Sequence, residues 1–392
     1  MTFGTLTLIV LAGLCGPLLG GPTRFPTPVV VGEILAGMAI GASGLQLIDA
    51  TEPTVDLLGQ VGFAMLMLAA GMHVPITTPN LMQRLPRAAR SAGLAAALAI
   101  PAAIATTALT GGNHTAVYAV LLSGGSAAVV LPSLHEVGLL RRAESLPIVL
   151  QIAVADLVAI IAVPIVLQPS HALRTALGSL AVGAAATLVY LVARMIDRSS
   201  TVATLRQLSA SRGWALDLRA ALIVLFALCS LAVQSETSIL IAGLSAGLVV
   251  SALGGPHRLS TQVIGIAQGF FVPLFFVVLG ARIDLSALSD RPSLLLLIAM
   301  LVVANVATHL ATAWLTRRPV AEGLLATAQL GLPAAIATLG LETGALDPGR
   351  AAAIVAAGLV SLPLAALGAR LLHRHHRHSP PQRLPGLGPQ IQ

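Results

Sequence analysis

The chain of 392 residues contains no lysine, and only 9% of its residues are charged and 3% are aromatic. A soluble domain carries about a quarter charged residues, so a protein of this size with so few charges could not cover its surface. This scarcity excludes a soluble globular enzyme, and the 56% of hydrophobic residues exclude a disordered chain. The two cysteines are too few for a disulfide framework or a cysteine metal site.

The sequence is rich in long apolar runs. The mean hydropathy of the chain is +0.91, and apolar runs of about 20 residues alternate with short polar joints, which is typical of a polytopic helical membrane protein. We therefore predict an all-α polytopic membrane protein with about thirteen transmembrane helices. The expected spans are 3–20, 27–42, 54–72, 88–109, 115–138, 145–167, 174–196, 216–233, 237–253, 260–281, 291–315, 320–342 and 350–371.

The positions of the arginines support this number of helices. If the spans are counted correctly, alternate loops should be rich and poor in arginine. One set of loops holds 18 of the 22 arginines, and the other set holds Arg174, Arg282, Arg291 and Arg350. Since arginine-rich loops stay inside the cell, we predict a multi-pass protein of the plasma membrane with its N-terminus outside and its C-terminus in the cytoplasm. The net positive charge is then a topology signal, and it predicts no nucleic-acid partner.

A weak internal repeat divides the spans into two groups of six. The second span of each group is rich in glycine, at 32–37 and 241–247, and the fifth is interrupted, at 123–126 and 331–333. A linker helix between the groups makes the two repeats inverted, and interrupted helices at matching positions are typical of transporter sites near the middle of the bilayer. The expected parts of the membrane domain, residues 1–372, are a first repeat at about 1–168, the linker helix at about 174–196 and a second repeat at about 216–372. A basic, disordered cytoplasmic tail is expected at 373–392.

Two carboxylates, Asp156 and Glu33, lie inside the predicted apolar spans. A carboxylate in the membrane needs a partner or water, so both are candidates for a function. Asp156 stands near the middle of its span, where it could bind a proton and a cation alternately; the alternative is a structural acid bonded to a Ser, a Thr or an interrupted backbone. Glu33 follows a glycine near the start of its helix, and we interpret it as a structural residue, with the edge of an access path as the alternative.

The two interruptions are the second kind of candidate. Ser123, Gly124, Gly125 and Ser126 cannot hold a strong helix, because each glycine costs about 1 kcal/mol relative to alanine. Unwinding there would free carbonyl and hydroxyl oxygens, which are tolerated at membrane depth only beside protein or a water-filled cavity. In the matching helix Pro333 removes a backbone donor, with Gln329 nearby. The alternative for both is close helix packing through small residues.

Five stretches of the chain, in the family's order, resemble the membrane domain of monovalent cation:proton antiporters, and the resemblance extends over about residues 5–370. They are 28–37, 66–72, 123–132, 155–156 and 275–284. The resemblance is to the second branch of these antiporters, which includes sodium/proton exchangers and potassium-efflux proteins. It implies a dimerisation domain, a mobile core domain in which two unwound helices cross, elevator-like alternating access and a homodimer.

The chain departs from this family at several positions. Ala155 precedes Asp156 where the family has Asp-Asp or Asn-Asp, Asn305 stands where a lysine is common, and Pro333 belongs to the segment that replaces an Arg-Gly-Glu-like sequence. Asn305 would then supply a neutral hydrogen bond near the crossing. With a single titratable group left there, the sequence predicts electroneutral one-to-one exchange.

We interpret the chain as a secondary antiporter that exchanges Na⁺ or K⁺ for H⁺, in the lipid bilayer, without a cofactor and without a metal other than the transported cation. Asp156 would bind the cation or the proton, and the unwound segment would supply oxygen ligands. A non-transporting membrane scaffold of the same fold is one alternative, favoured by Ala155 and the missing lysine. An exporter of an organic ion is another. A membrane enzyme would need clustered His, Asp or Glu within the spans, so we predict that the chain is not an enzyme.

Overall fold

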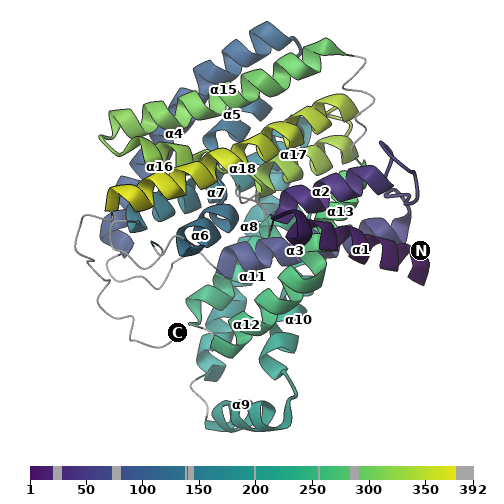
Figure 1. The fold of residues 1–392 in the computed structure, drawn as a ribbon. Helices are drawn as coiled ribbons and strands as arrows, with labels where there is room; N and C mark the ends of the chain where they lie inside the picture. Colours follow the sequence, from purple (N-terminus) through teal and green to yellow (C-terminus); the bar gives the residue numbers. More distant parts are fainter. Residues whose placement is uncertain are drawn as a thin grey trace. The chain divides into compact units, whose positions relative to one another are not determined.

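The computed structural model of the chain describes residues 1–20, 29–72, 81–136, 139, 145–197, 200–254, 257–282 and 291–376. These residues form helices joined by short loops, without a β-strand among them (Figure 1).

The first half contains α1 (Phe3–Gly20), α2 (Val29–Ile40), α3 (Pro53–Met72), α4 (Leu81–Thr110), α5 (Thr115–Ser123), α6 (Ala127–Glu136) and α7 (Leu146–Leu167). A short turn η1 (Pro169–His171) leads into α8 (Ala172–Asp197) and α9 (Ser200–Arg212). The second half contains α10 (Leu216–Gln234), α11 (Ile239–Ala252), α12 (His257–Ile266), the π-helical turn η2 (Ala267–Phe271), α13 (Val272–Arg282), α15 (Pro292–Leu315), α16 (Val320–Ala326), α17 (Gly331–Glu342) and α18 (Pro348–His376).

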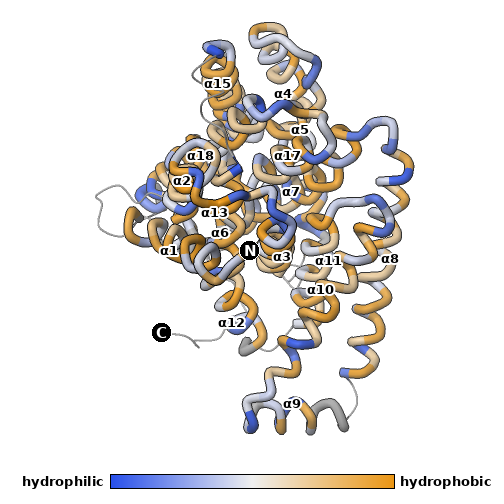
Figure 2. The backbone as a smooth tube through the Cα atoms, turned by 90° about the vertical axis from the view of Figure 1, so that its right-hand side faces the viewer, coloured by the Kyte–Doolittle hydropathy of each residue, from blue (hydrophilic) through white to orange (hydrophobic). Residues whose placement is uncertain are grey.

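The predicted all-helical membrane architecture is confirmed. In the described part of the chain, nine helical segments are long and apolar enough to cross a membrane, and three further apolar helices, at Phe3–Leu19, Val29–Ile40 and Ile239–Ala252, are shorter. The broken pair α5 and α6 corresponds to the one remaining predicted span, 115–138. Figure 2 shows apolar residues along most of these helices, with polar residues gathered mainly at their ends and in the joints.

Two helical features were not expected. α9 is a polar helix in the arginine-rich joint between α8 and α10, and apolar periodicity could not predict it. Arg206 of α9 forms ion pairs with Asp197, at the end of α8, and with Asp217, in the first turn of α10. The helix dipole of α10 favours the acidic Asp217 in its first turn. Arg206 therefore links α9 to the ends of both neighbouring helices through these ion pairs. The second feature is that α18 continues to His376 and covers the first residues of the expected tail, while residues 377–392 lie outside the described residues.

The helices form two compact units, each assembled from separate parts of the chain. Unit 1 contains Met1–Pro79, Ile160–Ser289 and Thr338–Gly349, and unit 2 contains Asn80–Ala159, Asp290–Ala337 and Arg350–Gln392. The division falls within α7 and within α17. The predicted repeats follow one another along the chain, whereas each compact unit combines parts of both halves. The repeat boundaries therefore stay a prediction.

Unit 1 holds a pair of helices, α2 and α13, that approach through glycines. A Cβ atom on Gly37 would lie 2.2 Å from the carbonyl oxygen of Val277, and a Cβ atom on Gly280 would lie 2.2 Å from the carbonyl oxygen of Ile34. Such distances leave no room for any side chain, so the backbones of the two helices are in direct contact. Small residues at helix contacts allow this close packing in membranes.

A second pair in unit 1, α3 and α11, packs in the same way. A Cβ atom on Gly247 would lie 2.3 Å from the carbonyl oxygen of Leu68, and one on Gly71 would lie 2.4 Å from the carbonyl oxygen of Leu244. The second helix of each expected repeat therefore packs on the third helix of the other, through equivalent glycines.

Unit 2 has its own apolar core, to which α6, α7, α16 and α18 contribute. Its fully buried members include Val130, Leu134, Leu325 and Ala365. α15 packs against α4, α5 and α16. The breaks between α5 and α6 and between α16 and α17 both lie in unit 2.

Candidate functional site

The first break lies where the sequence predicts it. α5 ends at Ser123 and α6 begins at Ala127, so residues 124–126 are unwound. A Cβ atom on Gly124 would lie 2.3 Å from Cδ2 of Leu332, and one on Gly125 would lie 2.9 Å from Cγ2 of Ile152. The glycines therefore weaken the helix and also allow α7 and α17 to approach the unwound backbone.

The two serines at the ends of this break have different surroundings. The Ser123 hydroxyl donates to the Val120 carbonyl of its own helix at 2.9 Å. Ser126 is 2% exposed, and its carbonyl accepts the backbone N–H groups of Val129 and Val130 at 3.2 and 3.0 Å. Ser126 thus starts α6.

Asp156 of α7 lies at the N-terminus of α6. Its Oδ2 accepts a hydrogen bond from the backbone N–H of Ala127 at 3.4 Å. The first N–H groups of a helix have no partner within the helix and carry a partial positive charge, so this end of α6 attracts a carboxylate. The other oxygen, Oδ1, makes no hydrogen bond within the described residues, and it is available to a proton or a cation. The neighbouring Ala155 is buried and contributes no second charge.

The second break lies four residues earlier than the sequence analysis placed it. α16 ends at Ala326 and α17 begins at Gly331, so residues 327–330 are unwound. The expectation that Pro333 interrupts the helix was wrong, because Pro333 lies in the first turn of α17. A proline is tolerated there, since the first N–H groups of a helix have no intrahelical acceptor in any case. Pro333 packs instead against α18, where a Cβ atom on Gly358 would lie 2.7 Å from its Cγ.

Two buried amides connect the two breaks. Gln329 Nε2 donates to the carbonyl of Leu121, in the last turn of α5, at 2.6 Å and to Asn305 Oδ1 at 3.2 Å. Asn305 Nδ2 in turn donates to the carbonyl of Thr327, at the end of α16, at 2.9 Å. Both side chains are at most 4% exposed. Carbonyls at the ends of the two broken helices are thus bound by neutral side chains, and the Leu121 carbonyl also accepts the backbone N–H of Gly124 at 3.3 Å.

Two residues near this arrangement were not predicted from the sequence. The backbone N–H of Gln329 donates to the Ser361 hydroxyl of α18 at 3.0 Å, a contact without any local signal in the sequence. His309 of α15 is 3% exposed and stands four residues after Asn305. The i, i+4 spacing places both residues on one face of the helix, and this could have identified His309.

Glu33 belongs to unit 1 and is 3% exposed. It packs beside α1, where a Cβ atom on Gly16 would lie 2.8 Å from its Cγ. Its Oε2 has no hydrogen-bond partner in the described part of the chain. The structural pairing expected for Glu33 is therefore not seen at this oxygen.

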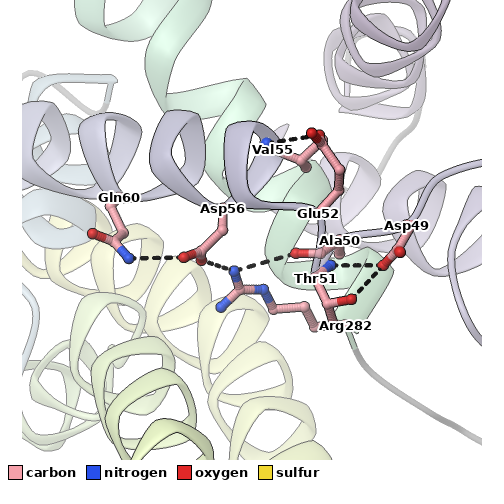
Figure 3. Close-up of polar contacts among 8 residues, drawn as sticks. All are labelled: Asp49, Ala50, Thr51, Glu52, Val55, Asp56, Gln60 and Arg282. Carbon is pink, nitrogen blue, oxygen red and sulfur yellow. Dashed lines mark hydrogen bonds and ion pairs between the residues drawn. The ribbon is translucent and has the colours of Figure 1, made fainter. Parts of the chain in front are cut away.

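A further polar cluster lies in unit 1, at the loop that precedes α3 (Figure 3). Arg282, at the end of α13, forms an ion pair with Asp56 and also reaches the carbonyl of Ala50 at 3.4 Å, while Gln60 donates to Asp56 at 3.0 Å. The cluster borders a cavity of about 630 Å³ that Glu342 also lines.

In the same loop, the hydroxyl and the backbone N–H of Thr51 donate to Asp49 at 2.6 and 2.8 Å. These hydrogen bonds favour the ionised carboxylate and hold the pKa of Asp49 below its ordinary value.

Comparisons with known proteins agree on one family. Residues 7–372 match the family described as the sodium/hydrogen exchanger, transmembrane. The chain is 23% identical to the putative Na⁺/H⁺ antiporter YjbQ of Bacillus subtilis, over 91% of this chain and 61% of YjbQ. It is 24% identical to the Na⁺/H⁺-K⁺ antiporter GerN of Bacillus cereus, over 77% of this chain and 76% of GerN.

A solved structure supports the fold. The sodium proton antiporter MjNhaP1 from Methanocaldococcus jannaschii matches with a TM-score of 0.59 and 17% identity, over 95% of this chain and 96% of that one. The chain spans about three fifths of the length of YjbQ.

Proposed function

The chain belongs to the sodium/hydrogen exchanger transmembrane family, and we propose that it is a secondary antiporter that exchanges Na⁺ or K⁺ for H⁺ by alternating access. It is a multi-pass membrane protein of a family of transporters. The observation that carries the proposal is Asp156, a carboxylate at the N-terminus of α6, beside an unwound segment within an apolar span, with one oxygen that makes no hydrogen bond to the described residues.

The chemistry of exchange follows from competition at Asp156. The positive end of α6 stabilises the ionised carboxylate, which can then bind a monovalent cation through its free oxygen. Oxygens of the unwound residues, Gly124 and Gly125 among them, would complete the coordination of the cation. Protonation neutralises the carboxylate and releases the cation, so one site carries either ion, and a gradient of one drives the other.

Both breaks and Asp156 belong to unit 2, so we propose that this unit carries the ions. K⁺ is included beside Na⁺ because GerN is named as an antiporter of both. We further propose a homodimer in the plasma membrane, with the N-terminus outside and the C-terminus in the cytoplasm. The uneven distribution of the 22 arginines supports this orientation.

The test is the substitution Asp156→Asn, in which an amide of the same size cannot exchange a proton. Glu236→Gln, the same change at an exposed carboxylate, is the matched control. Everted membrane vesicles are given a proton gradient, and its collapse is followed after addition of Na⁺, K⁺ or Li⁺ and with buffer alone.

We expect the wild type and Glu236→Gln to collapse the gradient on cation addition and Asp156→Asn to lose the response at an unchanged amount of protein in the membrane. A cation response that persists in Asp156→Asn would remove this residue from the mechanism. A wild type that responds to no monovalent cation would favour the scaffold or the exporter of an organic ion.

A further inference from the structure

The last turn of α5 has a modified pattern of hydrogen bonds at the first break. In a continuous helix the carbonyl of Leu121 would accept the backbone N–H of Gly125, four residues further on. Here it accepts the N–H of Gly124, three residues further on, at 3.3 Å and the side-chain amide of Gln329 at 2.6 Å. A carbonyl oxygen has two lone pairs, and both are therefore occupied. The N–H of Gly125 is left without its helical acceptor.

The next two carbonyls of α5 remain open. In a continuous helix, those of Leu122 and Ser123 would accept the N–H groups of Ser126 and Ala127. The N–H of Ala127 instead meets Asp156 at 3.4 Å, and neither carbonyl accepts a hydrogen bond from the residues that the structure describes. Such carbonyls are tolerated at membrane depth only beside protein or a water-filled cavity. They are available to a cation held at Asp156, beside the oxygens of the unwound residues.

Gln329 is held in place by two other helices. It is 3% exposed, and the amide nitrogen that reaches α5 also donates to Asn305 Oδ1, on α15, at 3.2 Å. Its backbone N–H donates to the Ser361 hydroxyl, on α18, at 3.0 Å, and its carbonyl accepts a hydrogen bond from the same hydroxyl at 3.4 Å. These contacts orient the amide independently of its bond to α5.

We propose that Gln329 holds the first break open and is thereby a positioning residue for the cation ligands. The inference rests on the proposed function of this break. Without the amide, one lone pair of the Leu121 carbonyl is open to the N–H of Gly125, and α5 extends into the unwound segment. The next helical bond, from the N–H of Ser126, then covers the carbonyl of Leu122.

The balance between the open and the extended form is a close one. The glycines at 124 and 125 oppose the helix, because glycine loses more backbone entropy on ordering than other residues. Buried N–H and C=O groups without partners favour the helix, because each of them is costly. One hydrogen bond from Gln329 shifts such a balance by about threefold to tenfold, which is the range of its net contribution.

The extended form affects the cation and the proton differently. It offers fewer oxygens to the cation, whereas the proton on Asp156 needs none of them. Loss of the amide therefore raises the KM for the cation in inverse proportion to the fraction of protein that is open. A saturating cation restores the open form, so the maximal rate stays the same.

The test combines transport with hydrogen exchange in the purified full-length protein. Gln329→Met keeps the length of the side chain and removes the donor, and Gln329→Asn keeps an amide that is one methylene shorter. Gln151→Met is the matched control, because Gln151 is an amide of the same unit that is 4% exposed and bonds to Arg318. Proton flux driven by Na⁺ or K⁺ is measured in proteoliposomes over a range of cation concentrations. Amide exchange is followed by mass spectrometry in peptides that cover residues 121–127.

We expect both variants at Gln329 to raise the KM for the cation by about threefold to tenfold at an unchanged maximal rate. Both should also slow amide exchange over residues 121–127, because α5 gains helical hydrogen bonds there. The direction of this change is decisive, since a variant that only loosened the fold would exchange faster. Gln151→Met should match the wild type in both measurements.

An unchanged KM in the variants at Gln329 overturns the inference, as does exchange over residues 121–127 that is unchanged or faster. A fall of the maximal rate at an unchanged KM overturns it as well, and each of these results leaves the role of Asp156 intact. If Gln329→Met does not accumulate in the membrane, Gln329→Asn decides by the same criteria. Absence of cation-driven proton flux in the wild type refutes the proposed function, and the exchange measurement still decides whether Gln329 holds the break open.

Discussion

The glycine contacts of unit 1 allow a quantitative test of how its helices are held together. In Gly247→Ala, the new Cβ atom would lie 2.3 Å from the carbonyl oxygen of Leu68, 2.7 Å from Cα of Gly71 and 2.8 Å from the backbone N of Met72. All three are backbone atoms of α3, so no change of rotamer can relieve the overlap. The helices must separate by roughly 1 Å to restore ordinary van der Waals contact.

The expected cost follows from this overlap. Extra methyl groups in a well-packed interior cost about 1–3 kcal/mol, and the need to move a whole helix places Gly247→Ala in the upper part of that range. The alanine also gains about 1 kcal/mol of helix propensity. Gly265→Ala in α12 is the matched control, because no atom lies within 4 Å of its new Cβ. The control gains the propensity without the overlap, so the difference between the two variants isolates the packing cost.

The measurement is thermal unfolding of the detergent-solubilised protein, followed by the loss of monodisperse protein in size-exclusion chromatography. We expect the midpoint to fall by several degrees in Gly247→Ala and to stay the same or rise in Gly265→Ala. The midpoint of Gly37→Ala should fall by a similar amount, since a Cβ atom there would overlap the backbone of Val277 in the same way. Equal midpoints for Gly247→Ala and Gly265→Ala would refute the close packing of α3 and α11.

Two further predictions concern the ion pair of unit 1 and the orientation of the chain. Asp56→Asn should lower the free energy of unfolding by about 1 kcal/mol or less, and so lower the midpoint only slightly, because the side chains of Asp56 and Arg282 are 32% and 19% exposed. The double variant with Arg282→Gln should lose less free energy of unfolding than the two single variants together. Strict additivity would show that the ion pair contributes nothing. In a cysteine-free background, an impermeant maleimide should label Ser170→Cys from outside intact cells and Ser211→Cys only after the membrane is opened, both positions being exposed. Labelling of Ser211→Cys from outside would reverse the proposed topology.

Composition and hydropathy were sufficient for the fold class, because a helix that crosses a membrane must satisfy its backbone internally and cover itself with apolar residues. The joints were harder to predict. α9 is polar, and Arg206 holds it in place through Asp197 and Asp217, so no apolar period marks it. The second break was misplaced because Pro333 is a strong helix breaker in the sequence, although a first helical turn accepts it without loss.

The candidate site was predictable only where its signal is local. Asp156 in an apolar span and the run from Ser123 to Ser126 can be recognised from neighbouring residues. The bond from Gln329 to the carbonyl of Leu121 connects residues 208 positions apart, and no local pattern contains it.

The two broken helices are not chemically equivalent, and this difference locates the proposed exchange. At the second break the carbonyl of Thr327 is bound by Asn305, and the N–H of Gln329 is bound by the Ser361 hydroxyl, all neutral partners. At the first break the N–H of Ala127 meets the carboxylate of Asp156, whose charge can change. A neutral amide cannot take up or release a proton at physiological pH, so we expect the second break to keep the same charge throughout a cycle. The proposed exchange therefore places the changes of charge at Asp156, beside the unwound residues 124–126.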